Sequence, residues 1–192
     1  MHDKIIQLMD KVVDLEQELE RDLEEKQTEF RYRLEEKRIH FEREMTESQR
    51  QLKVGLFQFI RRAKLRTLLS VPVIYGLALP LLIVDISVTI YQWICFTLWG
   101  MGRVRRRDYW LMDRGHLAYL NAIEKINCYY CSYANGLASY ISEVASRTEQ
   151  YWCPIKHARR VQHPHPRYWR YSDFGDAEAY RSTLDRFRKE LG

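Results

Sequence analysis

The strongest constraint on this chain is one long apolar segment. Residues 67–102 carry a single charged side chain, Asp85, in 36 residues. One membrane-spanning helix needs about 20 apolar residues, so two need about 40 together with a turn. The segment is too long for one straight span and slightly short for two. It predicts an integral membrane protein.

Basic residues stand on both sides of this segment. Lys and Arg close to a membrane segment favour the cytoplasmic side, so both flanks are predicted to be cytosolic. A single span cannot place both flanks on one side, which favours a membrane helical hairpin. The membrane-flanking basic residues are Arg61, Arg62, Lys64 and Arg66 before the segment, and Arg103, Arg105, Arg106 and Arg107 after it.

Asp85 gives a second argument for the hairpin. In a straight span its carboxylate would lie near the bilayer centre, at a cost of about 2.5–3.5 kcal/mol. A turn near residues 80–85 would carry it to the hairpin tip, and Pro72, Gly76 and Pro80 interrupt a continuous helix. Three alternatives stay open: a single tilted span, a flat interfacial segment, and a role for Asp85 as a pore or proton-relay group facing a shared interior.

Residues 1–66 differ sharply, with 15 basic and 15 acidic side chains and no proline. Their apolar residues recur every eleven positions, or three helical turns, which predicts a long helix with a narrow stripe that partner helices cover. We expect a coiled coil that drives homo-oligomerisation, with a lone solvated helix as the alternative. The stripe consists of Leu8, Leu19, Phe30, Phe41, Leu52 and Ala63, and of Val12, Leu23, Leu34, Met45 and Leu56.

The cysteines suggest a metal site. The first twenty residues mix charged and apolar side chains, so we expect no signal peptide and reduced thiols in all four cysteines. Cys128 and Cys131 share a helical face by spacing, and so do Cys153 and His157. Two such pairs on neighbouring helices could complete a tetrahedral zinc site and lock the helices together. The alternatives are a CxxC redox pair, an iron centre at Cys153, and buried structural thiols.

Residues 103–192 carry 16 basic and 10 acidic side chains. Apolar residues at helical spacing run from about 117 to 151, as one helix or as two broken near residues 135–136. A proline-containing loop over 155–170 precedes a last helix capped by Asp173 or Asp176. The many Tyr, Trp and Arg side chains of this region suit anionic lipid headgroups better than stacked nucleotides, so nucleic acid is not an expected partner.

Several segments of the second half of the chain resemble a known set of sequences. They are VPVIYGLALPLLIVDISVTIYQWICF, RRRDYW, HLAYLNAIEKINCYYCSYANGL, RTEQYWCPIKHARR and FGDAEAYR. Together they resemble a group of small proteobacterial inner-membrane proteins that share the YWCPIKHA-type segment, over residues 66–182. The resemblance implies an origin in the bacterial inner membrane. It implies no particular activity and carries over no catalytic residue.

These observations combine into an all-α membrane protein with both termini cytosolic. Residues 1–66 are the coiled-coil helix, 67–102 the membrane hairpin, and 103–192 a cytosolic helical module with the zinc site. The expected function is that of a self-associating, membrane-anchored scaffold that binds anionic lipids. The alternatives are an oligomeric channel or transport accessory with Asp85 facing its interior, and a metal- or thiol-dependent enzyme at the membrane surface. No catalytic residues are predicted, and an enzyme is the less favoured class.

Overall fold

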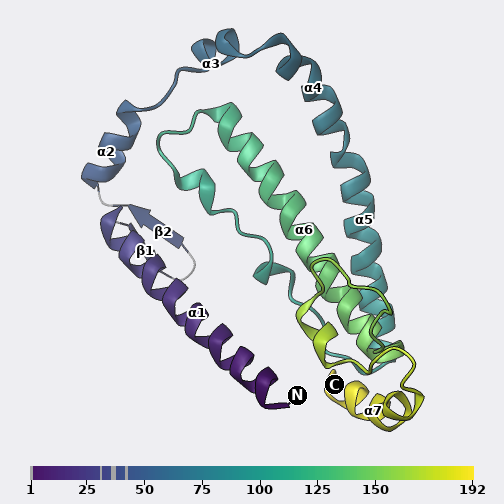
Figure 1. Cartoon of the computed structure of the whole chain (residues 1–192). Helices are drawn as coiled ribbons and strands as arrows, with labels where there is room; N and C mark the ends of the chain where they lie inside the picture. Colours follow the sequence, from purple (N-terminus) through teal and green to yellow (C-terminus); the bar gives the residue numbers. More distant parts are fainter. Residues whose placement is uncertain (1, 31, 36–37, 42) are drawn as a thin grey trace. The chain divides into compact units, whose positions relative to one another are not determined.

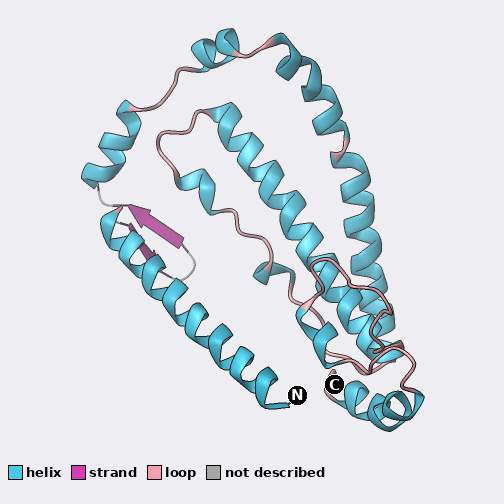
Figure 2. Cartoon of the chain, viewed as in Figure 1, coloured by secondary structure: helices cyan, strands magenta, loops and turns pink. Residues whose placement is uncertain are grey.

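The computed structural model describes residues 2–30, 32–35, 38–41 and 43–192. Most of this part of the chain is helical, which confirms the expected helical class (Figure 2). A two-stranded hairpin is the one sheet among the described residues. The chain divides into two compact units, Met1–Arg61 with Asp113–Ile126, and Arg62–Met112 with Asn127–Gly192, and each unit is described by itself.

The first unit contains α1 (His2–Glu29), β1 (Tyr32–Glu35), β2 (Arg38–Phe41), α2 (Arg43–Gln51), α3 (Leu56–Arg62) and the short η3 (Asp113–His116) (Figure 1). The two strands pair antiparallel, with Tyr32 opposite Phe41. The rings of these two residues lie 5.5 Å apart, as aromatic cross-strand pairs commonly do. The amide of Ala118 donates to Gln49 Oε1 at 3.1 Å within this unit.

The structure does not show the expected continuous helix over residues 1–66. The chain leaves helical geometry after Glu29, forms the β1–β2 hairpin, and returns to helix at Arg43. A narrow apolar stripe stabilises a long helix only when a partner covers it, and in the single chain Leu19, Leu23 and Phe30 remain about half exposed. The side chains of Leu8 and Leu34, also on the predicted stripe, lie outside the described part.

The second unit contains α4 (Leu65–Gly76), α5 (Ala78–Tyr91), the π-helical η1 (Gln92–Phe96), η2 (Arg106–Asp108), α6 (Ala122–Trp152, from Asn127 onward), η4 (Pro166–Arg170) and α7 (Ala177–Lys189). Together, α4, α5 and η1 make one helical run that is long and apolar enough to cross a membrane. It is the one such helix in the described residues.

The structure does not confirm the expected membrane hairpin. Helix α5 passes through residues 80–85 without a turn, and the amide of Leu81 donates to the Leu77 carbonyl at 3.2 Å. Pro80 lies in the first turn of α5, a position at which helices tolerate proline. The physical reason for the straight path is that Asp85 does not need a solvated tip, because its partners come from elsewhere in the same unit.

Helix α6 lies alongside this run and points in the same direction (Figure 1). Near the start, the hydroxyl of Tyr130 donates to the Ile74 carbonyl at 2.7 Å. Further along, Tyr91 and Thr148 hydroxyls lie 2.9 Å apart. At the end, the Trp99 ring stacks on Tyr151 with centroids 5.1 Å apart. These contacts join the two helices along most of their length.

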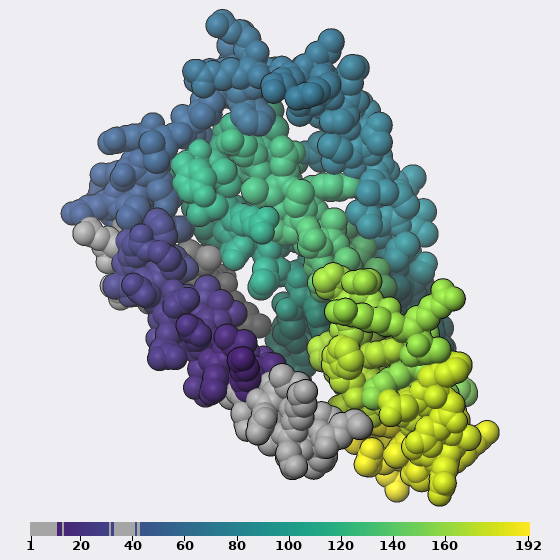
Figure 3. Space-filling model, in the orientation of Figure 1, coloured from purple at the N-terminus to yellow at the C-terminus, as the bar shows by residue number. Residues whose placement is uncertain are grey.

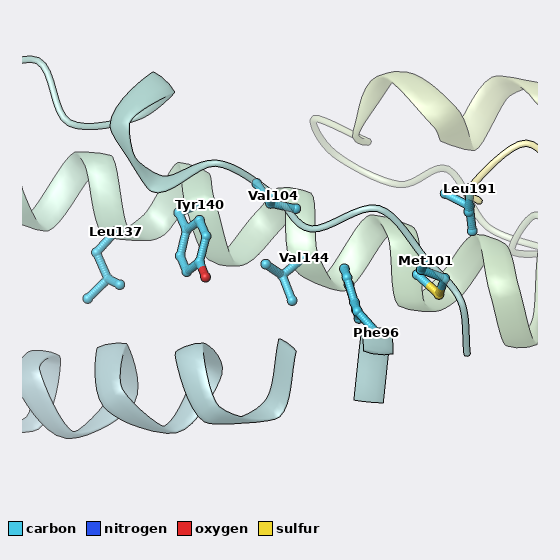
Figure 4. Packing of buried hydrophobic residues seen from close by; sticks show 7 residues of the cluster. All are labelled: Phe96, Met101, Val104, Leu137, Tyr140, Val144 and Leu191. Carbon is cyan, nitrogen blue, oxygen red and sulfur yellow. The ribbon is translucent and has the colours of Figure 1, made fainter. Parts of the chain in front are cut away.

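The core of the second unit lies between α6, η1 and the segment that follows η1 (Figure 4). Leu137, Tyr140 and Val144 come from one face of α6 at spacings of three and four residues, as an amphipathic helix requires. The predicted helix over 117–151 is therefore confirmed as a single element from Ala122 to Trp152. The remaining core residues are Phe96, Met101, Val104 and Leu191.

The last helix also agrees with the sequence. Asp176 is the N-cap of α7, and its carboxylate accepts from the Ala179 amide at 2.8 Å. Phe187 of α7 packs edge-on against Tyr171, with ring centroids 6.0 Å apart. The loop before α7 is held by the Arg170 guanidinium, which donates to Glu190 at 2.7 Å.

Candidate functional site

Asp85 lies at the centre of the most distinctive site in the second unit. It is the one charged residue between positions 67 and 102, and only 4% of its surface is exposed. Its Oδ2 accepts from the Arg106 guanidinium at 2.8 Å and from the Tyr133 hydroxyl at 2.9 Å. The Thr89 hydroxyl lies 3.5 Å from Oδ1. Oδ2 is therefore bound by two groups of the same chain, while the Thr89 hydroxyl donates to the Asp85 backbone carbonyl at 2.7 Å.

Arg106 reaches Asp85 because the chain reverses after η1. Gly100 takes φ +70°, a left-handed conformation that favours glycine. The residues that follow, 101–110, run back along the helix and are called the returning segment. The Arg106 guanidinium also donates to Thr89 at 3.0 Å and lies over the Trp110 ring, 4.7 Å from its centroid. The cation is thus fixed by one ion pair, one hydroxyl and one aromatic face.

Gln92 holds the returning segment about two turns of helix beyond Asp85. Its Oε1 accepts from the Val104 amide at 2.8 Å, and its Nε2 donates to the Tyr140 hydroxyl at 3.2 Å. The side chain is 6% exposed, so both ends of its amide need partners inside the protein. The π-helical turn that begins at Gln92 places this residue and Phe96 on the same buried face.

Gly136 allows the returning segment to pass close to α6. A Cβ atom at this position would lie 2.6 Å from the Tyr109 carbonyl oxygen, closer than real Cβ contacts allow. The Asn135–Gly136 pair therefore does not break the helix, as one reading of the sequence predicted. It provides the space in which the backbone of residues 109–110 packs.

Two effects determine the electrostatics of the Asp85 site. Removing a carboxylate from water costs several kcal/mol, and a close, hydrogen-bonded cation offsets most of that cost. Burial and the hydrogen bond to Asp85 raise the pKa of Tyr133 above its usual value, so its hydroxyl stays protonated and remains a donor. The arrangement neutralises the one charge on an apolar helix. It presents no free nucleophile or base.

A second charged cluster joins α6 to the loop before α7. The Glu143 carboxylate accepts from Arg147 at 2.8 Å and from Arg167 at 2.5 Å. Partial burial opposes ionisation of Glu143, but the hydrogen bonds from Arg147 and Arg167 outweigh it, and the net pKa of Glu143 is lowered. One oxygen of this carboxylate, Oε1, accepts from both arginines and so fixes the loop to the helix.

A third group lies at the C-terminal end of α6. His165 Nε2 is 2.8 Å from Glu149, and its Nδ1 is buried without a hydrogen-bond partner among the described residues. Burial and the Glu149 charge raise the pKa of the nearby Cys153 thiol. A thiol with a raised pKa is a weak nucleophile at neutral pH, so this group does not support thiol catalysis.

The predicted metal ligands are not brought together. Cys128 and Cys131 lie within α6, whereas Cys153 follows its last residue, so the two pairs are separated by 22 residues of one helix, or about 33 Å. His157 lies still further along the chain, with its ring against Tyr168. The structure therefore does not bring all four residues of one chain to a single ion. Among the described residues, no group of three or more His, Cys, Asp or Glu side chains could hold a metal ion.

The basic flanks are placed differently from each other. Arg61, Arg62, Lys64 and Arg66 are exposed around the start of α4. The second cluster does not lie beyond the far end of the helix, as the sequence suggested. Its first member, Arg103, donates to Thr97 at 3.1 Å, and Arg106 lies opposite Asp85, while Arg105 and Arg107 are exposed beside it.

Sequence reasoning missed Gln92, Tyr133 and the partnership of Arg106 with Asp85. A signal for the last was present, because a lone carboxylate in an apolar segment requires a partner and the nearest cations are those after residue 102. No signal marked Tyr133 among thirteen tyrosines. The chain matches no protein-family model, and no curated protein or solved structure shows significant similarity to it.

Proposed function

We propose that this protein is a membrane-anchored scaffold, held in the bilayer by the helical run of α4, α5 and η1. The observation that supports the proposal is the exposed surface of this run. It carries no charged side chain from Thr67 to Phe96, because the one carboxylate in the segment is paired inside the chain. Exposed and apolar residues include Leu82, Ile83, Ile86 and Ile90.

Such a surface is unfavourable in water. Contiguous apolar patches of this kind on soluble proteins are rare, and they mark sites of contact with lipid or with another protein. The basic residues before the run and those beside Asp85 favour a lipid surface of negative charge, at about 1 kcal/mol for each Lys or Arg near it. Anionic lipids of a bacterial inner membrane are therefore the proposed partner, with both flanks in the cytosol.

Self-association is the second part of the proposal. In α1, the stripe residues Val12, Leu19 and Leu23 lie on one face and are about half exposed, and so is Phe30, which directly follows the helix. The remainder of that helix is densely charged, so a second copy is the simplest cover for the stripe. A scaffold of this kind needs no reaction centre, and the clusters around Asp85, Glu143 and Glu149 serve packing.

The geometry does not favour the channel alternative. A pore-lining or proton-relay carboxylate must face a shared interior, whereas the carboxylate of Asp85 faces Arg106 and Tyr133 of its own chain. The exposed side of the helix, which would line or surround such an interior, carries Leu, Ile and Val side chains.

Extraction of bacterial membranes with alkaline carbonate tests the anchor. The wild-type protein is expected to stay in the membrane pellet, because apolar contact with lipid survives high pH. Replacing Ile83 and Ile90 by Asp on the exposed face is expected to release it. The matched control places Asp at the exposed Gln162 and Ser182, outside the apolar run, and is expected to stay in the pellet. Release of the wild-type protein would contradict the anchor.

The mass of the detergent-solubilised particle tests self-association. The double variant Leu19→Glu with Leu23→Glu is expected to lower the mass, because it places charges in the stripe. Its control, Gln17→Glu with Thr28→Glu, adds the same charge to the opposite face of α1 and is expected to leave the mass unchanged. An unchanged mass in the stripe variant would assign assembly to another part of the chain.

A further inference from the structure

We infer that α4, α5 and η1 lie within one leaflet, along the membrane plane, and do not cross the bilayer; the inference rests on the proposed membrane anchor. The occupants of the exposed face are then lipid acyl chains of the cytosolic leaflet. The covered face belongs to the rest of the second unit, which sits on the water side.

The first argument is which residues of the run are covered. They recur every three or four positions from Ala78 to Phe96 and form one stripe. The residues between them are exposed, apart from the half-buried Thr89, Tyr91 and Cys95. A lone in-plane helix supplies a polar face from its own sequence. Here α6 and the returning segment supply that face. The members of the stripe are Ala78, Leu81, Asp85, Val88, Gln92 and Phe96.

The second argument is how far α6 and the returning segment extend along the apolar run. Their contacts with it begin at Ile74, where the carbonyl accepts from Tyr130, and continue to Trp99, which stacks on Tyr151. Figure 3 shows the teal surface of α5 beside the green surface of α6. Because α6 runs beside the apolar helix, a crossing orientation would carry α6 into the bilayer too. Only about the first ten residues of the run are free of this neighbour.

The third argument is the position of the arginines along the length of the apolar run. Arg105, Arg106 and Arg107 belong to the segment that returns along the helix, and Arg106 is opposite Asp85, near the middle of the apolar run. In a crossing orientation these cations would lie at hydrocarbon depth, and all three are exposed on the surface of the unit. In the plane of the membrane they lie on the water side, within reach of anionic headgroups.

The fourth argument is the length of the run and the sign of its flanks. A helix of 32 residues is about 48 Å long, well beyond the roughly 30 Å of a hydrocarbon core. An in-plane helix has no such length requirement. It also leaves Arg61–Arg66 and Arg103–Arg107 on the same side, as the preference of basic residues for the cytosol requires. Trp93 and Trp152, both exposed, fit the headgroup boundary.

A depth profile from nitroxide spin labels tests the orientation. Cys95, Cys128, Cys131 and Cys153 are replaced by Ser, and one cysteine is introduced at a time on the face opposite the covered stripe. The labelled protein is reconstituted into vesicles of phosphatidylethanolamine and phosphatidylglycerol. Collision rates with oxygen and with a water-soluble nickel complex then give the depth of each label. The labelled positions are Leu69, Ile83, Ile90 and Leu98, all exposed.

The in-plane helix predicts similar, shallow depths at all four positions. A profile that is deepest near Ile83 and shallower at both ends would overturn the inference and restore a crossing helix, with the anchor itself intact. Labels that collide with the nickel complex as freely as in water would contradict both the membrane anchor and the in-plane orientation. Strong spin–spin broadening at these positions, without oxygen enrichment, would show that a second copy covers the face, which also overturns it.

The sidedness of two further cysteines gives an independent readout. Single cysteines in place of Lys64 and Arg103 are treated in intact spheroplasts with a membrane-impermeant maleimide. Both are expected to react only after the cells are opened. Reaction of one of them in intact spheroplasts would place the two ends of the run on opposite sides and contradict the in-plane orientation.

Discussion

The carboxylate of Asp85 on α5 lies 2.8 Å from the guanidinium of Arg106, which follows it by 21 residues. This contact closes a chain reversal and neutralises the one charge on an otherwise apolar helix. It also fixes the position of the arginine cluster along that helix, beside Asp85. The ion pair therefore connects the stability of the second unit with its orientation at a membrane.

Breaking this ion pair from the arginine side is expected to be costly. In Arg106→Met the buried carboxylate keeps only Tyr133 and Thr89, so we expect a loss of about 1–3 kcal/mol in unfolding free energy, below the value for a fully buried pair because the Arg106 side chain is 43% exposed. Asp85→Asn combined with Arg106→Met is expected to cost less than the sum of the two single changes. Denaturant unfolding in mild detergent measures these differences.

The control for this series is the neighbouring Arg107. Its side chain is 72% exposed and lies 3.9 Å from Asp108, so Arg107→Met is expected to change the unfolding free energy by less than about 0.5 kcal/mol. Equal losses for Arg106→Met and Arg107→Met would contradict the role given to the Asp85 pair.

Gly136 offers a test of how closely the returning segment packs on α6. In Gly136→Ala the new methyl group would lie 2.6 Å from the Tyr109 carbonyl oxygen, so the backbone must move and we expect a loss of about 1–3 kcal/mol. Gly76→Ala is the matched control, because no heavy atom lies within 4 Å of the added Cβ. Thermal unfolding should separate the two variants, and equal midpoints would argue against the packing described.

Glu143 predicts a loss of stability in acid. Its pKa is lowered in the folded protein, so the stabilisation is fully present above the usual glutamate value and is lost as the pH falls through the lower, folded value. We expect the thermal midpoint to fall below about pH 4.5, and Glu143→Gln to have a lower midpoint at neutral pH but a flatter decline in acid. The exposed Glu178→Gln is the control. A decline in Glu143→Gln as steep as in the wild type would assign the acid sensitivity elsewhere.

How far the sequence specified this structure depended on the range of the interactions. Periodicity identified the helix that becomes Ala122–Trp152, and an Asp cap marked the start of α7, because both signals are local. The argument for the hairpin from Asp85 did not anticipate its partner, because that partner lies 21 residues away and no spacing rule encodes such a contact. The same local reasoning misplaced the cysteines, since it expected a second helix from Cys153 to His157, where the structure has no helix after the end of α6.

The separation of the cysteines gives a prediction about metal. Because about 33 Å of helix separates Cys131 from Cys153, no single ion can bind to both in one chain. Elemental analysis of the purified protein is expected to show no zinc that depends on Cys128 and Cys153 together. One zinc per chain, lost in both Cys128→Ser and Cys153→Ser and retained in Cys95→Ser, would show that α6 is not continuous.

The central claim is that the exposed face of α4, α5 and η1 contacts lipid. A phospholipid with a photoactivatable group on its acyl chain tests it in native membranes, with mass spectrometry to locate the cross-links. We expect cross-links at Leu82, Ile83, Ile86 and Ile90, and none at Asp85 or Gln92, which face α6 and the returning segment. Cross-links confined to other parts of the chain, with none on this face, would contradict the account.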